Sequence, residues 1–319
     1  MQYERPLDLS AFLDHSDSAA VQEAVKNLFN LSYPGASFDP IEKVFRLCYD
    51  LYHGSFPGYS ACRVGYHDFR HTVDVFVAVS RLLDGCVLLG SAPSPLLAAE
   101  TLIAALLHDV GYVQEAGDDE GTGAKYTKTH VHRSVEFTAK YQDALGLDEE
   151  GSARVSRLIY GTDLALDFAQ LPYQNLDERL AATVLASSDL LGQMADRSYL
   201  EKLLFLYYEF REAGFGGYDS AFDILRKTSI FYASTKIRLD ITLAAVAPAA
   251  RKHFAVRSGE DRDIYREMIA RQMSYLDSIM EDDSVNFRHR LRRMALEEIE
   301  LAEKTRLAAF GVKAVMDIF

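Results

Sequence analysis

Histidine and aspartate residues occur in two short segments at spacings that suit a metal site. His67 and His71 are four residues apart, so on a helix their imidazoles would lie on one face. His108 and Asp109 stand next to each other at the end of a long apolar run. Neutral imidazole nitrogens and carboxylate oxygens are ligands that divalent Zn, Mn, Fe and Mg accept. One further acid or imidazole from elsewhere in the chain would complete a site for such a cation.

Asp189 is a candidate for that further ligand, because it lies inside the apolar segment 182–191. If its face of the segment is buried, the carboxylate needs a compensating partner, since an isolated buried charge is strongly unfavourable. The same argument applies to His108 and Asp109, which follow the apolar run 96–107. Taken singly, each residue could instead be a hydrogen-bonded core histidine or a helix-capping aspartate. Together they predict a metal site.

These motifs occur in the order found in a known family. The order of His71, the His108-Asp109 pair and Asp189 resembles that of the HD superfamily of metal-dependent phosphohydrolases. Within that superfamily, residues 66–232 resemble the catalytic domain of class I cyclic-nucleotide phosphodiesterases. The segments that carry the resemblance are Tyr66-His67-x-x-x-His71-x-x-Asp74-Val75, Arg133-Ser134-Val135-Glu136, Gly161-Thr162-Asp163-Leu164 and Ser187-Ser188-Asp189-Leu190.

The resemblance implies a metal-dependent enzyme that hydrolyses a phosphate ester, in the first place a phosphodiester of a nucleotide similar to a cyclic nucleotide. It implies one or two divalent ions, with the choice among Zn, Mn, Fe and Mg left open. The first ion would be held by His71, His108, Asp109 and Asp189. Asp109 has two carboxylate oxygens and would bridge to the second ion, as it does in the resembled family.

The resemblance also implies catalytic roles outside the metal ligands. Metal-activated water would attack phosphorus, and His67 would protonate the leaving oxygen as general acid. Asp163, or alternatively Asp74, would orient the imidazole of His67 and keep it charged.

The chain departs from the resembled family near the second metal. The phosphodiesterase signature continues His-Asp-x-x-His, and Tyr112 stands where its last histidine would be. Other HD proteins supply this ligand from a later helix, and His130 fits that pattern better than His132. Glu136 could hold a metal-bound water, although its spacing is one residue shorter than in the family. We therefore predict His130 as a ligand of the second ion.

A second departure concerns the substrate. The family clamps the base between a glutamine-bearing helix and an aromatic side chain, but the corresponding region 228–236 has no glutamine. Phe231 or Tyr232 could stack on a base. Arg226 and Lys227 could meet a phosphate, but the solvated surface is the expected place for both. Specificity for cyclic AMP or cyclic GMP is therefore not implied. The alternative functions are a nucleotidase or phosphomonoesterase with the same centre, and a catalytically silent HD module that binds a nucleotide as a sensor.

The composition limits the classes of partner. Among 319 residues, 34 Lys and Arg stand against 47 Asp and Glu, which gives a net charge of −13. This disfavours general nucleic-acid binding, because phosphate backbones need clustered basic side chains, whereas metal ions can still attract a small phosphate ester. Three cysteines without Cys-x-x-Cys spacing, and no signal-like or membrane-spanning apolar run, predict a cytoplasmic protein without a membrane partner.

The elements that must position these residues are expected to be helices, because alternating strand patterns are nearly absent. We expect one compact all-α, multi-helix bundle: a helical lead-in at 1–60, an HD or phosphodiesterase-like catalytic core at 61–250 and a helical extension at 251–319. One helix should run from His67 through Leu83, and another from Ser94-Pro95 to His108. Further helices are expected over 130–145, 152–160 and about 220–245, and one long or broken helical run is expected over 178–212.

Two segments leave alternatives open. The acidic, glycine-rich segment 117–123 is either a solvated loop or a mobile lid. In the charged tail, the apolar seam of Phe287, Leu291, Met294 and Ile299 either packs back on the core or supports a homodimer.

Overall fold

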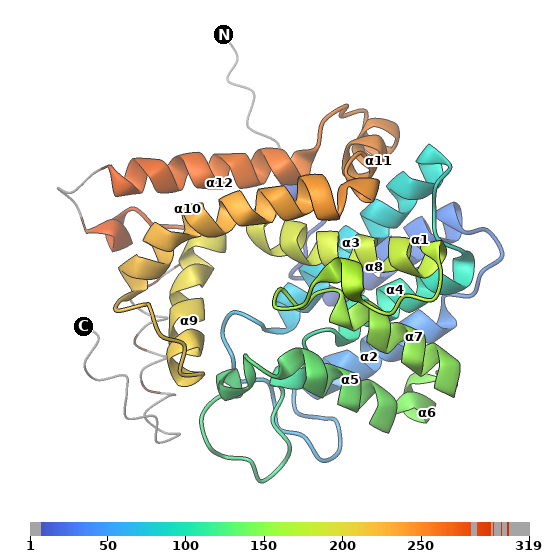
Figure 1. The fold of residues 1–319 in the computed structure, drawn as a ribbon, viewed down its shortest axis with the longest axis horizontal. Coiled ribbons are helices and arrows are strands. Elements are labelled where there is room, and N and C mark those ends of the chain that lie inside the picture. The colour runs from blue at the N-terminus through green and yellow to red at the C-terminus, as the bar shows by residue number, and fades with distance from the viewer. Residues whose placement is uncertain (1–7, 282–285, 295, 297–300, 302–304, 306–319) are drawn as a thin grey trace.

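The architecture is all-α, as predicted. The computed structural model describes residues 8–281, 286–294, 296, 301 and 305. In that part of the chain no β-strand forms, and an isolated bridge joins Tyr59 to Glu115. None of the helices described is long and apolar enough to cross a bilayer. The α-helices form one compact bundle (Figure 1), and they are α1 (Ser18–Ser32), α2 (Asp39–Tyr52), α3 (Phe69–Leu89), α4 (Pro95–Leu107), α5 (His130–Lys140), α6 (Gln142–Leu145), α7 (Glu149–Tyr160), α8 (Leu176–Ala195), α9 (Tyr199–Glu212), α10 (Ala221–Ile237), α11 (Ala249–Ser258) and α12 (Ile264–Met280).

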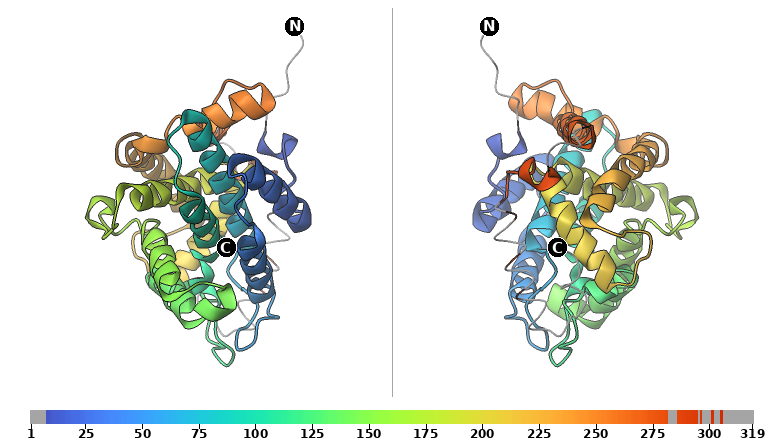
Figure 2. Two further views of the ribbon diagram at one scale, coloured as in Figure 1. Left: turned by 90° about the vertical axis from the view of Figure 1, so that its right-hand side faces the viewer. Right: turned by 90° about the vertical axis from the view of Figure 1, so that its left-hand side faces the viewer.

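Helix α3 runs through the middle of the bundle, where α8, α11, α4 and α1 pack on it (Figures 1 and 2). Asp68 fixes the start of α3, because the Asp68 side chain accepts a hydrogen bond from the backbone N–H of His71 at 3.0 Å. Gly90 ends it in the left-handed conformation, with φ +75°. The predicted start at His67 is therefore wrong, since Asp68 caps the helix and His67 lies in the preceding loop.

Helix α4 carries the His108-Asp109 pair at its end, as predicted. Ser94 caps the helix by accepting a hydrogen bond from the backbone N–H of Leu97, and Pro95 occupies the first turn. The helix is apolar nearly all round and almost entirely buried. His108 and Asp109 follow directly after its last residue and are only 1% and 3% exposed. Two polar side chains are thus placed deep inside the bundle.

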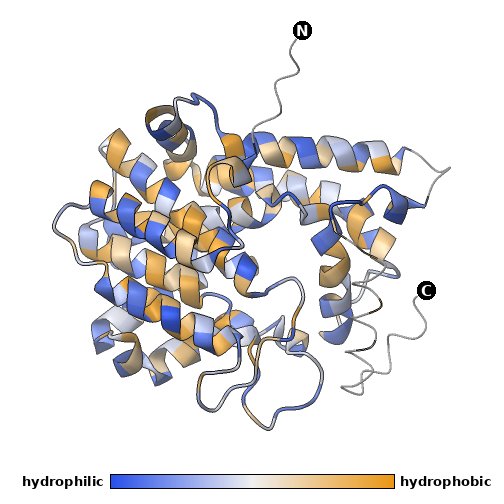
Figure 3. Cartoon of the chain, turned by 180° about the vertical axis from the view of Figure 1, so that it is seen from behind, coloured by the Kyte–Doolittle hydropathy of each residue, from blue (hydrophilic) through white to orange (hydrophobic). Residues whose placement is uncertain are grey.

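The helices from both ends of the chain cover this centre. α1 packs on α3 and α2 on α4, while α11 packs on α3 and α12 on α8 (Figure 2). Figure 3 shows hydrophobic and hydrophilic residues alternating along the helices, as expected when each helix buries one face. Among the described residues, one large hydrophobic core accordingly includes residues from Leu9 to Leu296, and a small second cluster consists of Val64, Tyr112 and Ala124.

Three of the predicted helices are interrupted. The run 178–212 is divided into α8 and α9 at residues 196–198, and the run 130–145 is divided into α5 and α6 at Tyr141. Helix α7 begins at Glu149, before the predicted start at 152. The helix near 220–245 ends as α10 at Ile237, and only π-helical and 3-10 turns continue to Val246.

The predicted apolar seam of the tail is described in part. Leu291 is buried, and Phe287 and Met294 are half-buried against the core. Ile299 lies outside the described residues. The described part of the seam therefore packs on the core, which is one of the two predicted alternatives.

Candidate metal centre and adjoining cavity

Four predicted ligands converge at one point of the bundle. His71 Nε2 lies 3.3 Å from His108 Nε2 and 3.2 Å from Asp109 Oδ2, and the latter two atoms are 3.3 Å apart. Asp189 Oδ1 lies 3.4 Å and 3.7 Å from the same two imidazole nitrogens. Metal–ligand bonds of about 2.0–2.2 Å place neighbouring donors about 2.9–3.6 Å apart. The spacing of the His71, His108 and Asp109 donors therefore fits a single divalent ion, and Asp189 lies beside the two imidazoles.

The hydrogen bonding of His108 shows which ring nitrogen faces the cluster. Nδ1 must donate to the backbone oxygen of Ala105 at 2.8 Å, because a carbonyl can only accept. In the neutral ring, Nε2 is then a lone-pair donor, and it faces His71 Nε2 and the Asp109 carboxylate. A hydrogen bond of this kind orients metal-binding histidines. Lone pairs that face one another need a proton or a metal cation between them.

Electrostatics favour positive charge at this point. Burial would lower the pKa of His71, but hydrogen bonds with Asp109 and Asp189 raise it to about 10. The pKa of His108 is also raised, against the effect of burial, chiefly by the charge of Asp109. Burial would raise the pKa of Asp109, but His108 and His71 hold it well below its usual range. Asp109 therefore stays ionised in a buried place, where a divalent ion would balance its charge.

His130 lies beside the other oxygen of Asp109. Its Nε2 is 3.5 Å from Oδ1, whereas Oδ2 faces His71 and His108. His130 Nδ1 donates to the backbone oxygen of Thr127 at 2.7 Å, which leaves Nε2 as the lone-pair donor. Burial lowers the pKa of His130 against the attraction of Asp109, so the ring stays neutral. Asp109 thus presents one oxygen to each of two donor groups, as a bridging carboxylate must.

Two contacts hold the start of α5 so that His130 lies beside Asp109. Gly111 approaches the helix so closely that a Cβ built on it would lie 2.0 Å from the backbone oxygen of His130. Ser134 Oγ donates to the backbone oxygen of His108 at 2.7 Å and accepts from the Gly111 N–H at 2.9 Å. The start of α5 is therefore fixed against the turn that follows α4.

Tyr112, at the position where the resembled family has a histidine, has a different role. Its ring stacks on the His67 ring with centroids 4.4 Å apart and an interplanar angle of 9°. It also stacks on the His130 ring, at 4.6 Å and 22°. Tyr112 is completely enclosed in the core. The two imidazole centroids are 6.2 Å apart, so Tyr112 packs against both rings and positions them without supplying a ligand nitrogen.

The other candidates on α5 lie away from the cluster. His132 Nε2 is 3.2 Å from Glu136 Oε1, and these side chains are 64% and 62% exposed. Neither residue lines the cavity described below. His130 is therefore the histidine of this helix that lies beside Asp109. The water-holding role considered for Glu136 is wrong, because its carboxylate faces solvent.

His67 contacts a glutamate that the sequence reasoning did not single out. His67 Nδ1 lies 2.7 Å from Glu209 Oε2 on α9, and the other oxygen of Glu209 accepts from the Tyr66 N–H at 2.6 Å. The Glu209 side chain is only 4% exposed. A sequence signal for it exists, since Glu209 is the one charged residue in the apolar run 203–210. Asp189 was identified by the same kind of signal.

Neither of the two predicted carboxylates, Asp74 and Asp163, is the one that contacts His67 Nδ1. Asp74 accepts a hydrogen bond from His15 Nδ1 at 2.6 Å and lies 3.9 Å from Lys202 Nζ. Asp163 accepts from the backbone N–H of Ala165 at 2.8 Å and so caps its own turn. Asp163 lines the same cavity as His67.

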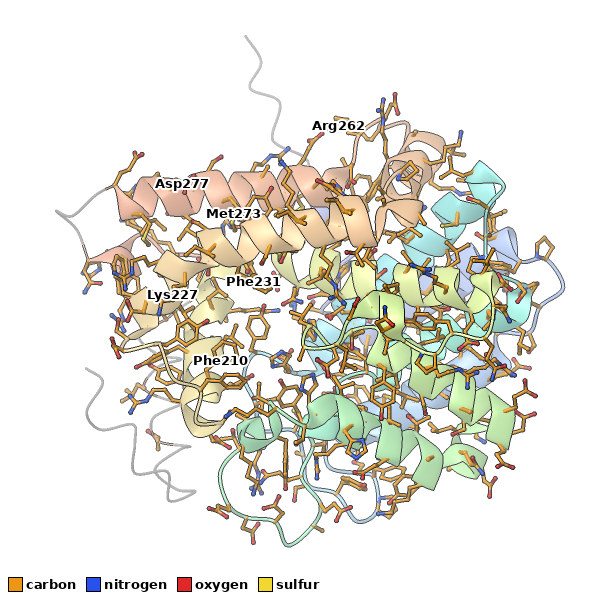
Figure 4. All side chains as sticks on the ribbon, viewed as in Figure 1. Phe210, Lys227, Phe231, Arg262, Met273 and Asp277 are labelled. Atoms are coloured by element: carbon orange, nitrogen blue, oxygen red, sulfur yellow. The ribbon has the colours of Figure 1, made fainter. Side chains whose placement is uncertain are left out.

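A cavity of about 580 Å³ lies over the cluster. Its polar lining includes His67, His71, Asp109, His130 and Asp189. Another wall is apolar and aromatic and comes from α9, α10 and the turn between them (Figure 4); its residues are Leu203, Leu206, Phe210, Phe215, Tyr218, Ile224 and Phe231. The volume suits a ligand of nucleotide size.

The residues predicted to meet the substrate divide between cavity and surface. Phe231 lines the cavity, whereas Tyr232 is not among the described lining residues. Lys227 also lines the cavity and is half-exposed, so it is placed where either predicted alternative, solvation or contact with a phosphate, can apply. Arg226 pairs with Asp223 and is exposed, as expected.

The glycine-rich segment 117–123 is tied to α9. Glu212 at the end of that helix accepts hydrogen bonds from the Thr122 N–H at 2.8 Å and from Thr122 Oγ1 at 2.7 Å. Thr122 and the two glycines beside it are buried, although the acidic residues before them are largely exposed. The segment is therefore a solvated loop with one anchored end.

One family model matches part of the chain. The model of a family described as Npun_R2479-like matches residues 170–243, which contain α8, α9 and α10. No curated protein matches the chain. The matched part supplies Asp189, Glu209 and the apolar wall of the cavity, but none of the histidines at the cluster.

Proposed function

We propose that this protein is a metal-dependent phosphohydrolase that acts on a phosphate ester, and specifically on a phosphodiester of a nucleotide. The observation that supports this function is the meeting of imidazole and carboxylate donors 3.2–3.7 Å apart beneath a cavity. His71, His108, Asp109 and Asp189 would hold one divalent ion such as Zn, Mn, Fe or Mg. His130 and the free oxygen of Asp109 would contribute to a second site.

A bound divalent ion would polarise a phosphoryl oxygen and lower the pKa of water. The protein's own side chains determine where the ester lies. The apolar wall from α9 and α10 excludes water and receives the organic part of the substrate, and Phe231 offers a ring face to a base. The phosphate is then directed towards the polar floor of the cavity.

His67 is placed to supply a proton to the leaving group. Glu209 engages Nδ1, which fixes the orientation of the ring and leaves Nε2 for a ligand in the cavity that His67 lines. The leaving oxygen of a phosphodiester departs as an alkoxide unless it is protonated, so a positioned acid lowers the barrier. Imidazole is the side chain suited to this exchange near neutral pH.

The test is hydrolysis of bis-p-nitrophenyl phosphate and p-nitrophenyl phosphate by the full chain supplied in turn with Zn, Mn, Fe and Mg. We expect metal-dependent release of nitrophenol, faster from the diester than from the monoester. Asp109→Ala should reduce turnover by more than about 100-fold, because it removes a donor shared by both metal groups. His132→Ala removes an exposed imidazole from α5 and serves as the matched control, with the wild-type rate expected.

A faster reaction with the monoester would favour the nucleotidase alternative at the same centre. No turnover of either ester with any of the four metals would contradict the proposal and favour the silent nucleotide-binding module.

A further inference from the structure

Two lysines face the cavity in a protein whose net charge is −13. Lys128 precedes α5, and Lys227 lies on α10. Among the described residues that line the cavity, these two alone carry a permanent positive charge. Asp109, Asp163 and Asp189 line it as well, so an anionic ligand is repelled wherever no cation offsets the carboxylates.

The ammonium group of Lys128 reaches the turn that joins α9 to α10. Nζ lies 3.5 Å from the backbone oxygen of Gly214 and 4.8 Å from the ring centre of Phe215. Neither partner is charged, and the lysine is exposed. An ammonium group held by a carbonyl and an aromatic face has further N–H donors to offer to an anion.

Lys227 reaches the same turn from α10. Its Nζ contacts the backbone oxygen of Gly217 and lies 4.8 Å from the ring centre of Tyr218. Figure 4 shows Lys227 and Phe231 on the same helix, and both line the cavity. The α9–α10 turn therefore gathers two ammonium groups at the aromatic wall.

We propose that Lys128 and Lys227 bind a second anionic group of the substrate, so that the substrate class is a phosphodiester that carries an additional phosphate. This inference rests on the proposed function, because the scissile ester is assigned to the metal centre. The two ends of such a substrate need positive charge at two places, and the cavity offers the cation site at its floor and the lysine pair at the α9–α10 turn. The aromatic wall accommodates the organic part between them.

The dinucleotide ApA and its 5′-phosphorylated form pApA differ only in a terminal phosphate and provide a matched pair of probes. Calorimetric titration of the metal-supplied full chain, with both dinucleotides as hydrolysis-resistant analogues that carry methylene at the scissile bridging position, measures both affinities. We expect pApA to bind roughly tenfold more tightly than ApA, and the double variant Lys128→Met/Lys227→Met to abolish this preference without changing the affinity for ApA. The double Lys→Arg variant should retain the preference. Lys236→Met, at an exposed position of α10 outside the cavity lining, is the control and should behave as wild type.

Equal affinities for the two dinucleotides, no measurable binding of pApA, or an equal loss for both in the double Met variant would overturn the inference. Turnover is scored separately with the nitrophenyl esters. Hydrolysis of the diester without a lysine-dependent preference for pApA would refute the lysine pair and retain the phosphohydrolase. A lysine-dependent preference in a protein that hydrolyses neither ester with any metal would retain the anion site and refute the phosphohydrolase.

Discussion

Three imidazoles of the site each have one ring nitrogen engaged by a fixed partner. His108 and His130 donate from Nδ1 to backbone carbonyls three residues earlier, and His67 uses Nδ1 to contact Glu209. In each ring, Nδ1 sets the orientation and Nε2 is left for chemistry. The partner distinguishes the roles, because a carbonyl favours the neutral lone-pair donor that a metal needs, whereas a carboxylate can also support a protonated ring.

His67→Ala should therefore leave metal content unchanged and slow the esters with poor leaving groups most. The loss in kcat for ApA should be about 100-fold or more, and the loss for bis-p-nitrophenyl phosphate much smaller, because nitrophenolate departs without a proton. Glu209→Gln should change both rates in the same direction by a smaller factor, since it removes only the charge that positions the ring. Equal losses for the activated and the unactivated ester would contradict the acid role.

The donors at the cluster could be predicted from the sequence, because residue type, spacing and order restrict them strongly. His71, His108, Asp109, Asp189 and His130 do lie together. The partner of His67 could not be predicted in the same way. The contact with Glu209 depends on how α9 packs beside the loop before α3, and no local spacing encodes that arrangement.

At the scale of the helices, a buried carboxylate joins three of them. Asp84 on α3 accepts hydrogen bonds from Ser32 of α1 at 2.8 Å and from His253 of α11 at 2.7 Å. It also accepts from Arg257 of α11 at 2.6 Å. Burial would raise the pKa of Asp84, but these three donors outweigh it and lower the pKa to about 2. The cluster links the outer helices to the one that carries His71.

The three hydrogen bonds to Asp84 predict that the stability of the fold depends on pH. A carboxylate whose pKa is depressed on folding, here from 3.8 to about 2, contributes stability that is complete above pH 4 and is lost as the pH falls towards 2. Wild type should exceed Asp84→Asn in unfolding free energy by about 2 kcal/mol at pH 7, and the gap should shrink below pH 4. Urea unfolding of wild type and Asp84→Asn at pH 7, 4 and 3 measures this difference in unfolding free energy. A gap that stays constant down to pH 3 would contradict the assignment.

Helix boundaries were predictable where the chain carries its own signal. Ser94-Pro95 begins α4 as expected, and Asp68 shows that a capping side chain takes precedence over the apolar pattern at the start of α3. The break between α8 and α9 has no such signal. Gln272 of α12 donates to the backbone oxygens of Asp196 and Arg197 there, so a distant helix satisfies the groups that the break exposes.

In the whole molecule, two groups of helices contribute different parts of the site. His71 lies on α3 and His130 on α5, while His67 directly precedes α3 and the His108-Asp109 pair directly follows α4. Helices α9 and α10 supply the apolar wall, and α9 also carries Glu209. Helix α8 connects the two groups, because it packs on α3 and carries Asp189. The all-α class followed from helical periodicity, but the cavity between these groups arises from long-range packing that the sequence pattern does not specify.

The proposed phosphohydrolase activity depends on whether His71, His108, Asp109 and Asp189 hold a cation. The most direct measurement is elemental analysis of the full chain after it has been supplied with Zn, Mn, Fe or Mg and passed through gel filtration. We expect at least one tightly bound ion per chain in wild type and in His132→Ala, and roughly tenfold less or lower in Asp109→Ala and Asp189→Asn, with circular dichroism showing that both variants remain helical. Wild-type protein that retains none of the four metals, or variants that retain as much as wild type, would contradict the account.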